Sequence, residues 1–168
     1  MRIIPDRVTK IKILKILIIF SVILFMDGVA TGQLVHEGSS EFKPGSEPDG
    51  FRGIKWGTDI STLKDMVFID AIYRDMKRYE RRGDELKIGE AKLDYIQYEF
   101  RKGRFYLVEM WFKGGENFNQ IKETMFEIYG KGRSMTEKTE GYFWEGEKTD
   151  MIMIYDSEVG GGIMISSK

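Results

Sequence analysis

The chain has 168 residues, a length typical of one domain, with 26 Lys and Arg, 27 Asp and Glu, one His and no Cys. The absence of cysteine excludes disulfide bonds, thiolate metal sites, a cysteine nucleophile and a cysteine-linked lipid anchor. The formal net charge of −1 excludes a domain-wide basic field for nucleic acid, so we expect no nucleic-acid partner.

The N-terminus has the order of regions typical of a signal peptide. Five basic residues lie between Met1 and Lys15, and an uninterrupted apolar segment at residues 16–26 precedes the small residues Ala30 to Gly32. The alternative is an uncleaved membrane anchor, but the apolar segment is much shorter than the about 20 residues that cross a membrane. We therefore predict a signal peptide at residues 1–32, cleaved after Ala30 or Gly32, a periplasmic or extracellular location, and no membrane span in the cleaved chain.

Residues 33–50 are predicted to form a flexible linker, because they are rich in glycine, serine and proline and have few apolar side chains. The single histidine, His36, lies in this segment. Neither a Ser-His-Asp triad nor a histidine metal site can be built around it there. We expect a single folded domain at residues 51–168.

The first element expected in this domain is a short helix. Thr58 is a suitable N-cap and Asp59 lies in the first turn, while Ile60, Leu63 and Val67 recur at helical spacing. These three apolar residues would form the buried stripe of the helix.

Residues 68–80 fit two secondary structures. Phe68, Ile72, Met76 and Tyr79 recur at helical spacing, but the segment also alternates in places and leads into an Arg-Gly-Asp turn signal. The pattern therefore leaves helix and strand open. We favour a strand, because the repeat described below requires strands here.

The segment from Leu93 to Phe112 is predicted to be a β-hairpin around which the other elements pack. Two runs rich in aromatic and β-branched residues flank Lys102-Gly103, where glycine suits the positive φ of a tight turn. Pairing Arg101 with Arg104 sets the register and defines two faces. One predicted face carries Ile96, Tyr98, Phe100, Phe105, Leu107 and Trp111. The other carries Leu93, Tyr95, Tyr106, Val108, Met110 and Phe112 together with Gln97 and Glu99.

A second helix is predicted at residues 115–130. Asn117 and Gln120 resemble a capping box, apolar residues recur on one face, and Gly130 is a suitable C-terminal cap. Three short strands are expected to follow, near residues 141–145, 149–155 and 162–166.

The two halves of the domain resemble each other at an offset of 58 residues. Residues 57–65 match residues 115–123 in residue class at most positions, and the same offset aligns the turn Lys102-Gly103 with Gly160-Gly161. We therefore predict a tandem α-β-β-β repeat, with its halves at about 51–108 and 109–168. The predicted fold is an α+β two-layer sandwich, in which one antiparallel sheet carries two helices on one face.

This architecture resembles the β-lactamase-inhibitor-protein type of small secreted bacterial domain, which is similarly built from two helix-then-strands repeats. The resemblance covers residues 51–168 at the level of topology, and this chain lacks the disulfides of that family. It implies that the domain binds another protein on the concave face of its sheet. No functional residue is carried over from the family.

We expect no catalytic, cofactor-binding or metal-binding residues. Two carboxylate pairs, Asp94 with Glu109 and Asp150 with Asp156, are candidates for a glycosidase pair or a calcium site, but their spacing fits no ligand loop. The glycines at 160–162 lack the following Lys and Ser or Thr of a phosphate loop. A small secreted hydrolase with a carboxylate pair is kept as the alternative function.

Two surfaces are predicted to bind partners. A cluster of basic residues favours either an anion-binding patch or a strand edge that charge protects against aggregation. The residues of this possible patch are Arg74, Arg78, Arg81 and Arg82. The mixed polar and aromatic face of the hairpin favours protein binding, through Tyr95, Gln97, Tyr106, Met110 and Phe112. The predicted function is an exported, non-catalytic protein-binding module, whose partner is another exported protein.

Overall fold

The computed structural model describes residues 40–135 and 140–168. The predicted signal peptide, the first part of the predicted linker and His36 lie outside these residues. The strands are β1 (Gly50–Phe51), β2 (Ile54–Lys55), β3 (Met66–Tyr73), β4 (Met76–Arg81), β5 (Lys87–Ile88), β6 (Ala91–Lys92), β7 (Tyr95–Arg101), β8 (Arg104–Phe112), β9 (Arg133–Ser134), β10 (Glu140–Glu145), β11 (Thr149–Asp156) and β12 (Gly160–Ser167). The helical elements are a 3₁₀ helix, η1 (Ile60–Thr62), and an α-helix, α2 (Gly115–Tyr129).

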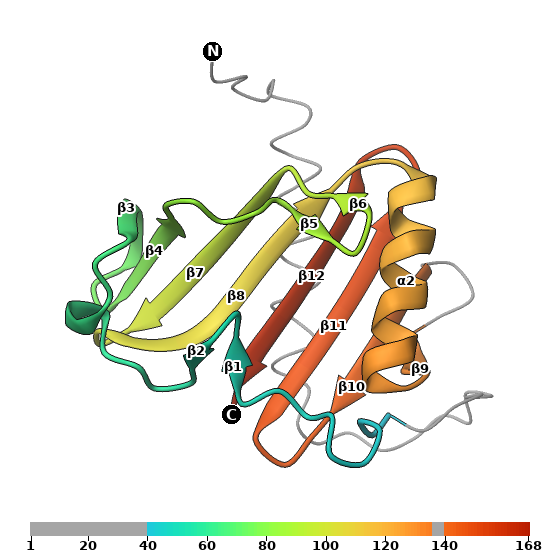
Figure 1. The fold of residues 1–168 in the computed structure, drawn as a ribbon, viewed down its shortest axis with the longest axis horizontal. Helices are drawn as coiled ribbons and strands as arrows, with labels where there is room; N and C mark the ends of the chain where they lie inside the picture. The colour runs from blue at the N-terminus through green and yellow to red at the C-terminus, as the bar shows by residue number, and fades with distance from the viewer. Residues whose placement is uncertain (1–39, 136–139) are drawn as a thin grey trace. The chain divides into compact units, whose positions relative to one another are not determined.

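Eight of the strands form one antiparallel sheet in the order β3-β4-β7-β8-β12-β11-β10-β9 (Figure 1). The strands of the first half, β3, β4, β7 and β8, follow one another across the sheet, and so do those of the second half. The two halves meet where β8 pairs with β12. Each half is therefore an antiparallel meander, and the last strands of the two meanders are neighbours.

The predicted pair of helices is wrong, because the described residues contain only one α-helix on this sheet. In place of the first helix the chain forms η1, where the side chain of Asp59 accepts a hydrogen bond from the Ser61 N–H. Leu63 then has an extended backbone, with φ −104° and ψ 108°, and β3 begins three residues later. The fold is mostly β with a single helix, so the predicted two-helix sandwich is corrected.

The second predicted helix is confirmed as α2. Its buried residues Phe118, Ile121 and Met125 lie at helical spacing and face the sheet. Gly130 ends the helix with a φ of 87°, and its N–H donates to the carbonyl of Phe126. Glycine is suited to this position because side chains rarely adopt a positive φ.

The ambiguous segment at residues 68–80 is extended, as favoured in the sequence analysis, and forms most of β3 and β4. The two strands pair with register shifts between Phe68 and Asp70 and between Ala71 and Tyr73. Ile69 and Ile72 are therefore extra residues on β3, and they bulge from the ladder.

The central hairpin is confirmed as β7 and β8, with Arg101 opposite Arg104. Lys102 and Gly103 have φ values of 51° and 77°, the combination required by a two-residue turn that matches the strand twist. A register shift after Glu99 leaves Tyr106 as an extra residue on β8. This bulge exchanges the faces of all later residues on β8, because side chains alternate along a strand.

The three predicted strands of the second half correspond to β10, β11 and β12, but the turn predicted at Gly160-Gly161 is wrong. The chain turns earlier, where the Asp156 carboxylate accepts hydrogen bonds from the N–H groups of Glu158 and Val159. Gly161 lies inside β12, where a Cβ atom would come within 2.2 Å of the Phe112 ring. Glycine is needed at this position for close packing and not for a turn.

The core lies between the sheet and α2, on a side that we call the helix face. The hairpins β1–β2 and β5–β6 lie on this face too (Figure 1): the Phe51 and Trp56 rings pack on Tyr98 and Phe105, and β6 contacts α2. The buried cluster comprises Ile54, Ala91, Leu93, Ile96, Tyr98, Phe100, Phe105, Val108, Met110, Phe112, Phe118, Ile121, Met125, Trp144, Met151, Met153, Ile163 and Ile165.

Residues 40–50, which fall in the predicted linker, contact both α2 and the sheet. The Lys43 N–H donates to the Tyr129 carbonyl, and the Phe42 ring meets the Tyr129 ring edge-on. The Glu47 carboxylate accepts hydrogen bonds from the N–H groups of Lys148 and Thr149. This part of the chain is therefore fixed to the end of α2 and to the β10–β11 turn.

Candidate functional site

The outermost strand of the first half, β3, carries most of the exposed apolar surface of the described residues. Val67, Phe68, Ile72 and Tyr73 are 40%, 54%, 37% and 76% exposed, and only Leu86 and Ile128 are other large apolar residues exposed in the described part of the chain. Val67 and Phe68 point to opposite faces of the sheet, so the exposed residues border this strand on both faces. Exposed apolar residues gathered on one strand mark a site of interaction more often than isolated ones do. We call these four residues, with their strand, the β3 edge.

The two edges of the sheet differ in length. At one edge β3 has eight residues, and at the other β9 has two. Short edge strands prevent unwanted strand pairing, whereas a long apolar edge presents backbone N–H and C=O groups to another strand. Among the described residues, no strand pairs with the outer side of β3.

Aromatic rings join the β3 edge to the core. Phe68 packs edge-on against Tyr79 of β4, with 5.7 Å between ring centroids, and Tyr79 packs in the same way against Phe100 of β7, at 5.2 Å. Tyr79 and Phe100 lie on the helix face, and so does Phe68. Phe68 is half exposed and Phe100 is buried. These ring contacts therefore support β3 only on the side of β4.

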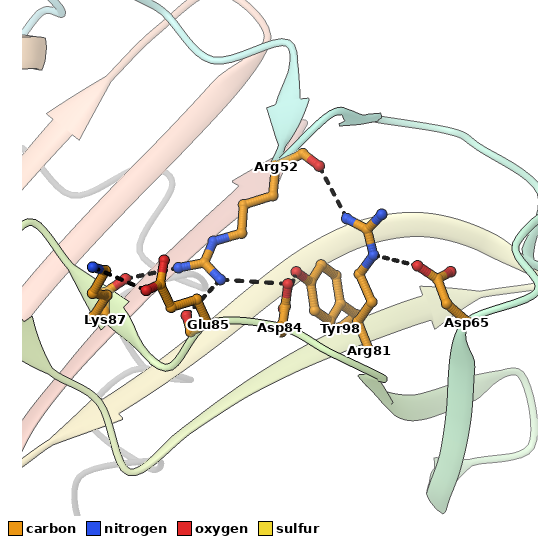
Figure 2. Close-up of polar contacts among 7 residues, drawn as sticks. All are labelled: Arg52, Asp65, Arg81, Asp84, Glu85, Lys87 and Tyr98. Carbon is orange, nitrogen blue, oxygen red and sulfur yellow. Dashed lines mark hydrogen bonds and ion pairs between the residues drawn. The ribbon is translucent and has the colours of Figure 1, made fainter.

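A polar network fixes β4 to the β1–β2 turn (Figure 2). Arg81 at the end of β4 donates from Nε to the Asp65 carboxylate at 2.5 Å and from Nη1 to the carbonyl of Arg52 at 3.1 Å. The Arg81 hydrogen bond lowers the pKa of Asp65 and, reciprocally, raises the pKa of Arg81. The ion pair between Arg81 and Asp65 therefore holds the residue before β3 against the end of β4.

The other half of the network joins the β1–β2 turn to the loop before β5. The Arg52 guanidinium donates to the carbonyls of Glu85 and Lys87, both at 2.7 Å, and lies 3.4 Å from the Asp84 carboxylate (Figure 2). The Tyr98 hydroxyl donates to Asp84 from the core side. Burial, and then this hydrogen bond, raise the pKa of Tyr98. Each charged group here is matched by a protein partner, which indicates a structural role.

The four arginines of the predicted anion-binding patch do not converge on one site. Arg78 pairs with Glu99 at 3.3 Å, on the face opposite α2, whereas Arg81 lies on the helix face and bonds to Asp65. Arg74 and Arg82 are exposed beyond the strand ends. Arg78 and Arg81 are three residues apart on β4, so their side chains point to opposite faces of the sheet.

The five residues of the predicted partner-binding face are divided between the two faces of the sheet. Met110 and Phe112 are fully buried members of the core, whereas Tyr95, Gln97 and Tyr106 lie on the other face. The physical reason is the Tyr106 bulge, which the sequence pattern did not reveal. The predicted common face is therefore corrected.

The bulge brings together a polar cluster on the second face of the sheet that the sequence analysis did not single out. The Tyr106 hydroxyl donates to Glu99 at 2.7 Å, and the Tyr95 hydroxyl donates to Glu109 at 2.9 Å. Burial raises the pKa of Glu109, and the nearby charge of Glu99 adds to the effect. Arg78 pairs with Glu99, so the cluster is a cross-strand network of matched charges and hydrogen bonds.

The two carboxylates of each candidate hydrolytic pair are separated in the structure. Asp94 lies three residues before Gln97, which is opposite Glu109, so about 10 Å of strand separates this pair. Asp94 pairs with Lys113 at 3.5 Å, and Asp150 pairs with Lys168 at 3.3 Å. Asp150 and Asp156 lie near opposite ends of β11, about 20 Å apart at about 3.3 Å per residue. Within the described residues, no group of three or more His, Cys, Asp or Glu is arranged to hold a metal ion.

A cavity of about 540 Å³ is lined by residues from 40–47 and 145–147. One carboxylate in this cavity belongs to Glu47. Burial alone would raise its pKa, but hydrogen bonds from the backbone N–H groups of Lys148 and Thr149 have a larger combined effect and lower it. A general acid requires a raised pKa near the working pH. Glu47 therefore fits a structural role at this position better than an acid catalyst.

Comparisons with protein-family models, with curated proteins and with solved structures found no match for this chain. None of the helices in residues 40–135 and 140–168 is long and apolar enough to cross a membrane. Within the described residues, the most distinctive surface is the β3 edge, where exposed apolar side chains lie on a strand with one unpaired side.

Proposed function

We propose that this protein is an exported, non-catalytic binding module and that its contact surface is the β3 edge. The observation that carries the proposal is the concentration of exposed apolar side chains on one long, unpaired edge strand. Strand addition at such an edge provides affinity through backbone hydrogen bonds and specificity through alternate side chains. The order of basic, apolar and small-residue regions at the N-terminus supports export.

The same observation moves the proposed surface away from the central hairpin. Met110 and Phe112 belong to the core and cannot meet a partner without unfolding. On β3, by contrast, Phe68 and Tyr73 combine aromatic area with exposure, which is typical of residues that contribute strongly to protein interfaces.

The alternative, a small secreted hydrolase, has weaker support. Its best carboxylate candidates are Glu99 and Glu109, which lie on adjacent strands, and the raised pKa of Glu109 suits a general acid. However, both carboxylates are nearly buried and bond to tyrosine hydroxyls from their own sheet. Carboxylates that are buried and bonded within the sheet in this way fit a stabilising role better than contact with a substrate.

Site-specific photo-crosslinking in producing cells tests the proposal. A benzophenone amino acid replaces Phe68 on the β3 edge in one variant and Ile128 on α2 in a matched control, since the two positions are 54% and 48% exposed. We expect a discrete covalent adduct from position 68 and none from position 128. Equal adducts from both positions, or none from position 68, would overturn the proposal.

A further inference from the structure

We draw no further inference here: the strongest candidate, the exposed apolar surface patch along β3 in the described part of the chain, carries nothing beyond the proposed function, because nothing in the structure shows what covers it.

Discussion

Two segments of this chain look alike in sequence and fold differently. Residues 57–65 and 115–123 match in residue class, yet the first forms the three-residue η1 and the second begins the 15-residue α2. The residues that follow decide the outcome. After Asp65 the chain continues as Met-Val-Phe-Ile, which favours a strand, whereas after Glu123 apolar residues keep helical spacing to Met125 and beyond.

This difference has consequences for the sheet. The second half is covered by α2, so its strands are buried, whereas β3 and β4 of the first half have no helix over them. Polar contacts around Arg81 and Arg52 hold this flank in place. Without a helix, the first half has less cover on its helix face, and the strand order leaves β3 at the edge of the sheet.

The largest effect is expected under α2. Replacing Ile121, which is fully buried, with Ala should lower the free energy of unfolding by about 2–5 kcal/mol, because it removes apolar contacts and leaves a cavity. Ile128→Ala on the exposed side of the same helix should cost less than about 1 kcal/mol. Denaturant titrations of both variants measure the difference, and similar costs would show that α2 does not cover the core as described.

The aligned glycines of the two halves should respond differently to Ala. At Gly161 the new Cβ meets the Phe112 ring, which is packed between its neighbours, so we expect a loss of about 1–3 kcal/mol. At Gly103 there is space, with the nearest atom 3.8 Å away, and only the positive φ adds strain, at about 1 kcal/mol. Thermal melts compare them; a smaller loss at Gly161 would argue against the close approach of β12 to Phe112.

The contribution of the β3–β4 end of the sheet to stability should depend on pH through Asp65. Its pKa is lowered below the ordinary value of 3.8 by the Arg81 hydrogen bond, so the ionised carboxylate stabilises the fold above that pH, and the contribution is lost as the pH falls through the folded-state pKa. Asp65→Asn should therefore cost about 1 kcal/mol at pH 6, and the difference from the unaltered protein should shrink by pH 2–3. Asp49→Asn removes a carboxylate from a fully surface ion pair, and as the control it should cost less than Asp65→Asn at pH 6.

The smallest effect on stability is expected at the β3 edge itself. Phe68 is half exposed and contacts Tyr79 from one side, so Phe68→Ala should lower the free energy of unfolding by less than about 1 kcal/mol. Denaturant titration measures this cost. If Phe68→Ala costs as much as Ile121→Ala, then β3 is part of the core and its exposure has been misjudged.

Several elements could be predicted from the sequence because their signals are local. The turn at Lys102-Gly103, the helix that ends at Gly130, and the strands of the second half all follow from turn residues and periodicity. The first helix could not be predicted correctly, because its capping residues also suit a 3₁₀ turn. The deciding signal is the apolar run after Asp65, but its residue Val67 also continues the helical spacing of Ile60 and Leu63.

The candidate site was less accessible to sequence reasoning. The faces of the hairpin depend on one bulged residue, Tyr106, and alternation alone gives no warning of a bulge. The β3 edge depends on the order of strands in the sheet, which no local pattern contains. The basic residues from Arg74 to Arg82 allowed either an anion-binding patch or a strand edge protected by charge, and the second interpretation agrees with the position of β3 at the edge of the sheet.

Hydrogen exchange of the β3 amides tests whether this strand has an unpaired edge. The amides of Met66–Tyr73 that do not bond to β4 should exchange quickly, while those of α2 and β11 exchange slowly. Exchange at these β3 amides that is as slow as in β11 would contradict an unpaired edge.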